Sequence, residues 1–408
     1  MKVQERFLNY VKINTQSDDT SNTFPSTKCQ FDLAYQLEKE MKELGLADVE
    51  VDENGYVYGK LPATKGYENV THLGFLAHMD TSPDASGEHV QPMLHSNYNG
   101  ENILLGTSGK WLKKETFPHL EQLKGRTLIT TDGTTLLGAD DKAGIAEIMT
   151  GCERLIKEEI PHGEISILFT PDEEVGQGMD KVNLEKFHPQ FAYTMDGGPE
   201  GEIEYECFNA ATAHVLIQGV SVHPGTAKDT MINAALIGCE FNQRLTQIEI
   251  PSKTEGYEGF YHLCEMQGDV TKAKLEYIIR DHDKTLFENK KKRMIQLAED
   301  FNKQYGEDTV IIQMKDSYYN MAEKIQPHMH LIENAKKATE QAGVVPKVQP
   351  IRGGTDGARL SFMGIPCPNI GTGGYGYHGE YEHITVEGME YAVEILLNIV
   401  RLYAKGEN

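Results

Sequence analysis

Short apolar runs alternate with amphipathic segments along the first half of the chain. The runs cover residues 74–79, 128–130, 165–170 and 191–195, and each has the length and composition of a central strand covered on both faces. Between two of them, apolar residues from Ile145 to Ile156 recur at helical spacing. Either Asp140 or Asp141, which precede this stripe, suits the N-terminal cap of a helix. This alternation predicts an α/β domain over residues 1–208.

A different rhythm follows over residues 209–320. Strands are predicted over 211–220, 260–266, 273–280 and 309–314, and helices over 229–247 and 283–305. The order βαββαβ is that of a ferredoxin-like unit. The α/β pattern then resumes, with helices over 330–342 and 387–404. We therefore expect one catalytic α/β domain, built from 1–208 and 321–408, that is interrupted by an inserted domain at 209–320.

Composition excludes several classes of protein. Lys and Arg number 39 against 62 Asp and Glu, and the formal charge of −23 disfavours nucleic acid and anionic membranes as partners. Charged residues interrupt the apolar positions of the N-terminal segment, so it is not typical of a signal peptide, and nothing resembles a membrane span. The six cysteines form no C-x-x-C pair, which argues against disulfides and thiolate zinc sites. We expect a cytoplasmic protein without nucleic-acid or membrane partners.

Five stretches place His, Asp or Glu just after a buried strand or in a Gly-rich turn. They are HMDT (78–81), LLGADDKAG (136–144), TPDEEVG (170–176), TMDGG (194–198) and GYGYHGEYEH (374–383). Each alone also fits an ordinary turn, a helix cap or a buried histidine. Ligands of α/β sheets gather at the carboxyl ends of strands, so we expect the five to converge there. Their carboxylates would repel one another unless a cation were present.

The residue types indicate which metal would bind. Imidazole and carboxylate ligands without thiolates suit zinc, cobalt or manganese better than calcium or magnesium. With more than four candidate ligands, two ions roughly 3.5–4 Å apart that share one carboxylate fit better than one ion. Side chains alternate along a strand, so His78 and Asp80 should point to the same face, where Asp80 could orient the imidazole.

Seven motifs resemble, in order and over essentially the whole chain, those of metallopeptidase family M20: HMDT, GADDKAG, TPDEEVG, MDGG, HPGTAKD, RGGTDG and YHGEYE. The resemblance implies a zinc-peptidase-like catalytic domain with a mixed central sheet and an inserted ferredoxin-like lid. It also implies two Zn²⁺ per chain, with Co²⁺ or Mn²⁺ as substitutes. The ligands that it implies are His78 and Asp196 for the first ion, Glu174 and His378 for the second, and Asp140 as the bridge.

The same resemblance implies that Asp80 supports His78 and that Glu173 is the general base. Spacing alone does not say which of the adjacent Glu173 and Glu174 is the base and which the ligand. His383 likewise competes with His378 for the last ligand position.

Four residues are candidates for holding substrate. His223 precedes a Pro-Gly turn, and the family resemblance implies that it stabilises the oxyanion of the tetrahedral intermediate when the lid closes. Arg280 and Arg352 carry the planar fork that suits a peptide carboxylate. Asn233 is a further polar candidate. A loop histidine, a surface arginine and an exposed helix residue are the ordinary alternatives for these positions.

The expected function is that of a di-zinc aminopeptidase, which hydrolyses the N-terminal bond of tripeptides through a metal-bridging water activated by Glu173. The tripeptide preference rests on the resemblance alone. An M20-type deacylase or carboxypeptidase, acting on N-acyl amino acids or dipeptides, would share the metal centre. A non-catalytic metal-binding scaffold would keep the fold without the activity. The expected partners are short peptides, and the resemblance is compatible with a homodimer formed through the lid.

Overall fold

The computed structural model describes residues 1–406, which form two compact units. Unit 1 comprises Met1–Tyr205, Glu323–Gln349 and the chain from Thr355 onward. Unit 2 comprises Glu206–Ala322 and Pro350–Gly354. Unit 1 therefore consists of three separate stretches of the chain, and unit 2 consists of the two segments inserted between them.

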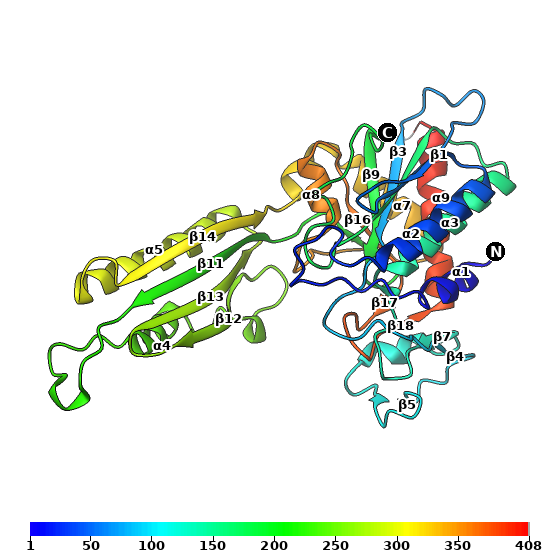
Figure 1. The fold of residues 1–408 in the computed structure, drawn as a ribbon. Coiled ribbons are helices and arrows are strands. Elements are labelled where there is room, and N and C mark those ends of the chain that lie inside the picture. The colour runs from blue at the N-terminus through cyan, green and yellow to red at the C-terminus, as the bar shows by residue number, and fades with distance from the viewer. Residues whose placement is uncertain (407–408) are drawn as a thin grey trace. The chain divides into compact units, whose positions relative to one another are not determined.

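An eight-stranded mixed sheet forms the centre of unit 1 (Figure 1). Its strands, in spatial order, are β1 (Ala47–Val51), β2 (Val57–Leu61), β8 (Ile165–Thr170), β3 (Leu73–His78), β9 (Phe191–Gly197), β16 (Asn369–Gly371), β10 (Glu202–Glu204) and β15 (Lys347–Val348). The central strands β8, β3 and β9 are parallel to one another, whereas β2 runs antiparallel to β8. The carboxyl ends of β3, β8 and β9 therefore lie along one edge of the sheet.

Helices cover both faces of this sheet. The helices of unit 1 are α1 (Val3–Tyr10), α2 (Gln30–Leu44), α3 (Ala139–Lys157), α7 (His330–Gln341), α8 (Asp356–Phe362) and α9 (Val386–Ala404). On one face Phe75 stacks on Tyr193, whose hydroxyl donates to the Leu331 carbonyl of α7. On the other face, Leu76 and Leu360 of α8 belong to one buried cluster. The strands are thus buried on both sides, as their continuous apolar runs predict.

Helix α3 lies unusually close to the sheet. A β-carbon added to Gly144 would stand 1.9 Å from the carbonyl oxygen of Met195 in β9. Only glycine permits this approach, which fixes the N-terminal turn of α3 beside the end of β9.

Two smaller sheets complete unit 1. One contains β17 (Gly374–Tyr375), β18 (His383–Thr385), β7 (Leu128–Thr130) and β4 (Met93–His95), and the other pairs β5 (Ile103–Leu104) with β6 (Trp111–Leu112). The prediction that 128–130 is a strand of the central sheet is therefore wrong, although the residues do form a strand. Three apolar residues indicate burial, but they do not determine which sheet a strand joins.

Unit 2 has a four-stranded antiparallel sheet in the order β12-β13-β11-β14, with two helices against it. Its elements are β11 (Asn209–Gln218), α4 (Ala234–Leu245), β12 (Phe260–Gly268), β13 (Lys272–Asp281), α5 (Lys284–Tyr305) and β14 (Val310–Tyr318); the short α6 (Ala322–Ile325) follows. The core between helices and sheet includes Val215, Phe241, Leu275 and Met294. The chain order βαββαβ with this strand order is the ferredoxin-like arrangement.

The fold class is confirmed, but one segment differs from the expected division of the chain. Residues 350–354, which fall in the expected second catalytic segment, belong to unit 2. The cause is Arg352, whose guanidinium donates to the carbonyls of Gly256, Glu258 and Thr254. These acceptors are backbone carbonyls, so the side chains of the sequence do not indicate that Arg352 binds there.

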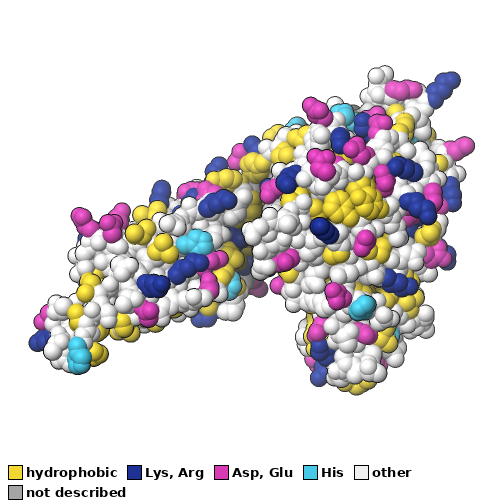
Figure 2. Space-filling view, viewed as in Figure 1, with side chains coloured by type: hydrophobic (Ala, Val, Ile, Leu, Met, Phe, Trp, Pro, Cys, Tyr) yellow, Lys and Arg dark blue, Asp and Glu magenta, His cyan; other side chains and the backbone are white. Residues whose placement is uncertain are grey.

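No helix within residues 1–406 is long and apolar enough to cross a membrane. On the face shown in Figure 2, Lys and Arg side chains are scattered among Asp and Glu rather than gathered in one patch.

Candidate metal centre

The expected ligands of unit 1 meet where the parallel strands end. His78 is the last residue of β3, Asp196 lies near the end of β9, and Glu174 follows β8 in the next turn. The backbone of β3 and β8 is aligned so that His78 faces Thr170. The edge of the sheet thus brings His78 together with Glu174 and Asp196, which come about a hundred residues later in sequence.

The carboxylate of Asp140 lies between two imidazoles. Its Oδ1 is 2.8 Å from Nε2 of His78, and its Oδ2 is 3.3 Å from Nε2 of His378. Asp140 has φ −86° and ψ 103°, outside the helical region, so its side chain leaves the path of α3. A carboxylate that offers one oxygen to each side has the geometry required of a bridging ligand.

Asp196 and Glu174 complete the two sides of this arrangement. Asp196 Oδ1 lies 3.4 Å from Nε2 of His78, and Glu174 Oε2 lies 3.0 Å from Nε2 of His378. His78 is only 2% exposed, whereas 44% of the His378 side chain is accessible. The centre is therefore closed toward the sheet and open to solvent beside His378.

Asp141 has a different role from Asp140. Its Oδ1 accepts from the amide of Gly144, which is a capping hydrogen bond, and its Oδ2 accepts from the amide of His78. Asp141 thus joins the start of α3 to the end of β3. Of the two candidates for the cap, Asp141 is the one that caps the helix, whereas both carboxylate oxygens of Asp140 face histidines.

Asp80 supports the centre through more than one contact. Its carboxylate accepts from the amides of Glu173 and Glu174, at 3.0 and 3.1 Å. Nδ1 of His78 lies 3.0 Å from the backbone carbonyl of Asp80 and 3.5 Å from its carboxylate. The backbone carbonyl is therefore the nearer acceptor for His78, and the carboxylate fixes the turn that carries the two glutamates.

Glu382 holds the backbone around Asp140. Its Oε2 accepts from the amides of Leu137 and Gly138, at 2.6 and 2.8 Å, and its Oε1 accepts from the amide of Asp140 at 3.0 Å. Three amides at the start of α3 thus converge on one buried carboxylate. Its place in the GYGYHGEYEH stretch was the only sequence signal, and that signal did not distinguish it from neighbouring acidic residues.

Asp356 is a second carboxylate that sequence reasoning missed. It begins α8 and accepts from the hydroxyl of Thr170, the last residue of β8, at 2.7 Å. Burial raises the pKa of Asp356 to about 7. The RGGTDG motif contains it, but only the fold shows that it lies at the end of β8.

Burial dominates the electrostatics of the cluster. It raises the pKa of Glu174 to about 7 and that of Asp196 to about 6. Burial also raises the pKa of Glu173 well above its usual range, and the charges of Asp196 and Asp356 add to this. For Asp140 burial acts in the same direction, but hydrogen bonds from His378 and His78 outweigh it and lower the pKa.

The two imidazoles respond in the opposite sense. Hydrogen bonds to Asp140 and Glu174 raise the pKa of His378 to about 11. Burial alone would lower the pKa of His78, but the charge of Asp196 and the bonds to Asp140 raise it overall. Divalent cations compete with protons for such ligands, because imidazole and carboxylate must be deprotonated to bind a metal.

The arrangement fits divalent cations. The donor atoms of His78, Asp140 and Glu174 lie within 4.8 Å of one another, and so do those of His78, Asp141 and Asp196. Oε1 of Glu174 is buried and has no hydrogen-bond partner among the described residues. A buried carboxylate oxygen left without a donor is costly, and a cation would satisfy it. The residues present therefore match a metal centre of imidazoles and carboxylates.

His383 lies outside this cluster. Its Nδ1 donates to the carbonyl of Tyr381, and its ring stacks on that of His119. Burial lowers the pKa of His383 to about 4. Of the two histidines that the sequence left open, His378 is the one beside Asp140 and Glu174.

The four expected substrate residues all belong to unit 2. His223 is exposed and its Nδ1 accepts from the amide of Gly225 in the turn that follows. Asn233 caps α4 by accepting from the amide of Leu236. The alternative left open for Asn233 was an exposed helix residue, whereas the residue is half-buried and caps the helix.

Both arginines have partners within unit 2. Arg280 donates to the carbonyls of Ala211 and Ile279 and lies over the ring of Tyr318. The guanidinium of Arg352 lies over the rings of Phe208 and Phe260, and it binds the carbonyls described above. These contacts give each arginine a structural role, whatever its relation to substrate.

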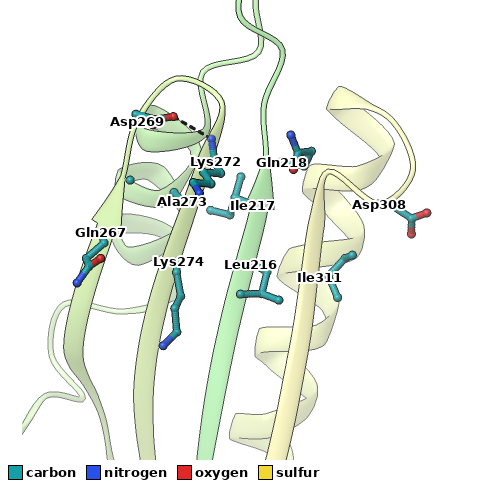
Figure 3. A pocket seen from close by; sticks show the side chains of 11 residues that line it. Leu216, Ile217, Gln218, Gln267, Asp269, Lys272, Ala273, Lys274, Asp308 and Ile311 are labelled. Atoms are coloured by element: carbon teal, nitrogen blue, oxygen red, sulfur yellow. Dashed lines mark hydrogen bonds between the residues drawn. The ribbon is translucent and has the colours of Figure 1, made fainter.

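A separate hollow of about 690 Å³ lies on the sheet of unit 2 (Figure 3). Its walls include Leu216, Gln267, Lys274 and Ile311, from all four strands, and the turn of Asp269 closes one end. None of its lining residues is a histidine or a cysteine, and its acidic residues are limited to Asp269 and Asp308. This hollow has no cluster that matches the metal chemistry of unit 1.

Curated relatives match the chain along its whole length. Peptidase T of Caldanaerobacter subterraneus subsp. tengcongensis is 56% identical over 406 residues, which are 99% of each chain. Peptidase T of Clostridium perfringens is 54% identical over 405 residues, again 99% of each.

Among solved structures, aminopeptidase PepT from Bacillus cereus has the same fold, with a TM-score of 0.79, 23% identity and coverage of 99% of this chain and 98% of that one. A dinuclear metal-binding M20 peptidase from Bacillus subtilis matches with a TM-score of 0.66 at 14% identity, covering 99% of both chains. The model of peptidase family M20/M25/M40 matches residues 130–402. The chain therefore belongs to peptidase family M20/M25/M40.

Proposed function

We propose that this protein is a two-metal aminopeptidase that releases the N-terminal residue from tripeptides. The observation that carries the proposal is the Asp140 carboxylate, which offers one oxygen toward His78 and the other toward His378. The full-length relatives named peptidase T support the choice of reaction. A tripeptidase from Staphylococcus aureus, with a TM-score of 0.79 at 22% identity, has the same fold.

The ligands that we propose are those expected from the sequence. His78 and Asp196 hold the first ion, Glu174 and His378 hold the second, and Asp140 is shared. Zn²⁺ is the proposed metal, with Co²⁺ or Mn²⁺ as substitutes, because imidazole and carboxylate donors suit these ions. When bound, such ions supply Lewis acidity and make the loss of a proton from water favourable near neutral pH.

Glu173 is the proposed general base. It follows β8 beside Glu174, and the Asp80 carboxylate holds the amides of both residues. Its raised pKa, which is caused first by burial, suits a group that accepts a proton from the attacking water and later delivers it to the leaving amine. The bond that breaks is the N-terminal amide, and the proton passes through the Glu173 carboxylate.

Two further carboxylates position the ligands. Glu382 holds the three amides around Asp140, and Asp80 holds the turn of Glu173 and Glu174 while its carbonyl accepts from His78. Both are positioning residues, since neither stands among the proposed ligands. Contacts of this kind fix the direction in which a ligand atom points.

The substrate contacts of unit 2 remain predictions. We propose that His223 stabilises the oxyanion and that Arg280, Arg352 or Asn233 contributes to binding the rest of the peptide. A homodimer formed through unit 2 and a cytoplasmic location are likewise proposals. An M20-type deacylase or carboxypeptidase is the second candidate function, and an aminoacylhistidine dipeptidase from Vibrio alginolyticus shares the fold at a TM-score of 0.64.

A panel of substrates separates these functions. The zinc-loaded protein should release the N-terminal amino acid from a free tripeptide and leave the same tripeptide intact when its amino group is acetylated. Removal of the metal with a chelator should abolish this activity, and Zn²⁺ should restore it. Hydrolysis of N-acetyl amino acids with no release from tripeptides would favour the deacylase. Bound metal without any chelator-sensitive hydrolysis would favour the non-catalytic metal-binding scaffold.

Replacing each of the two adjacent glutamates distinguishes their roles. Glu173→Gln should lower kcat by about 10²–10⁴-fold while metal content is unchanged, because the proton acceptor is lost and the ligands remain. Glu174→Gln should lose part of the bound metal, as measured by elemental analysis. Glu185→Gln, at an exposed position further along the same loop, is the control for loss of one charge. If Glu173→Gln loses metal and Glu174→Gln keeps it, the two roles are reversed.

Removal of Glu382 should weaken metal binding without removing a ligand. In Glu382→Ala the amides of Leu137, Gly138 and Asp140 lose their acceptor, so we expect metal affinity to fall by about 10–100-fold in a chelator competition. The control is Glu380→Ala in the same loop, where the side chain pairs with Lys110. Equal affinity in the wild type and Glu382→Ala would show that Asp140 is held by other contacts.

A further inference from the structure

Three potential metal ligands lie at the edge of the sheet where the parallel strands begin. His72 immediately precedes β3, Glu164 immediately precedes β8, and His188 lies three residues before β9. Because these strands are parallel, their starts share one edge, and their carboxyl ends with the centre described above lie at the other. None of the three residues belongs to the motifs that indicated the family, so the cluster is separate from the proposed active site.

The three side chains converge. One donor atom from each lies within 4.8 Å of the other two. Nε2 of His72 is 3.4 Å from Oε1 of Glu164, and the rings of His72 and His188 have centroids 5.6 Å apart at an angle of 89°. Two imidazoles and one glutamate form a donor set that binds zinc in proteins, with water in the remaining position.

The backbone around these residues is held in place. The amide of Leu73 donates to the carbonyl of Glu164 at 3.2 Å, which links the starts of β3 and β8. Gln190 is bound to His72 twice, since its amide donates to the His72 carbonyl and its side-chain oxygen accepts from the His72 amide. The three segments that carry the donors are therefore hydrogen-bonded to one another. This lowers the conformational entropy that would be lost when an ion binds.

The charges and exposure favour a cation from solution. Burial lowers the pKa of His72, which favours the neutral form of the imidazole that a metal ligand requires. The side chain of Glu164 is 41% exposed, and His188 is exposed as well. Lys60 is a nearby positive charge that would repel a bound cation, but its ammonium is paired with Asp48.

One neighbour competes for the proposed ligand atom. The hydroxyl of Ser166 lies 2.8 Å from Nε2 of His72. Without an ion, the cluster would be an ordinary surface group in which His72 contacts a serine and a glutamate. The two interpretations differ in what they predict for removal of the Ser166 hydroxyl. If the cluster binds a metal, the lone pair of His72 Nε2 becomes free for the ion. If the cluster is purely structural, a contact that it needs is lost.

We propose that His72, Glu164 and His188 form a third metal site, which binds one divalent transition-metal ion such as Zn²⁺. The ion connects the starts of β3 and β8 with the segment that leads into β9. Binding to the folded state alone stabilises a protein by mass action, so occupancy of this site raises the temperature of unfolding. The site does not depend on the proposed peptidase activity.

Metal titration of the full-length protein tests the proposal. The protein is equilibrated with buffered free Zn²⁺ across a range of concentrations, and bound zinc is measured by elemental analysis. We expect His188→Ala to bind one equivalent less than the wild type at saturation, with an unchanged circular dichroism spectrum because His188 is exposed. His262→Ala, at another exposed histidine, should bind as much zinc as the wild type.

A second set of variants separates a metal site from a structural cluster. Ser166→Ala should keep the additional equivalent, and zinc should raise its melting temperature as it does for the wild type. The part of this rise that comes from the third site should be missing in His188→Ala. The proposal is overturned if His188→Ala binds as much zinc as the wild type. Failure of the peptidase assay would leave these comparisons unaffected, because each counts bound metal.

Discussion

The mutual repulsion of buried carboxylates is the constraint on which this structure depends. Asp140, Glu174 and Asp196 lie around two histidines at one edge of the sheet, and Glu173 is beside them. Burial raises the pKa of Glu174 and Asp196 because a carboxylate removed from water is costly to ionise. Divalent cations relieve both the repulsion and the cost of burial. The same charges that repel one another therefore suit this edge of the sheet to the two metal ions that we propose.

The sheet holds these carboxylates together because the backbone segments that carry them are fixed in position. Parallel strands β3, β8 and β9 end side by side, and Gly144 allows α3 to approach β9 so closely that Asp140 reaches the same edge. Asp80, Asp141 and Glu382 then bind backbone amides of the segments that carry the ligands. Three of the proposed ligands, His78, Asp140 and Glu174, thus have their own amide bound by a carboxylate, and such a bond is stronger than one between neutral groups.

Much of the fold and of the candidate site could be predicted from the sequence, for a different reason in each case. Apolar runs predicted β3, β8 and β9 because buried parallel strands carry no polar alternation, and the βαββαβ order of unit 2 followed from periodicity. Motifs that place His, Asp or Glu just after such strands predicted that these residues converge, and the proposed ligand set came from their resemblance to family M20. By contrast, 128–130 was assigned to the wrong sheet, because pairing between strands depends on contacts that a short apolar run does not encode. The contacts of Glu382 and Arg352 could not be predicted, since their partners are backbone groups distant in sequence.

The central claim is that Asp140 is shared by two ions, and anomalous X-ray diffraction from crystals of the zinc-loaded protein tests it most directly. Data collected above and below the zinc absorption edge should show two peaks beside the Asp140 carboxylate. One should lie near His78 and Asp196, and the other near Glu174 and His378. A single peak there, or zinc bound only at a distance from Asp140, would contradict the account.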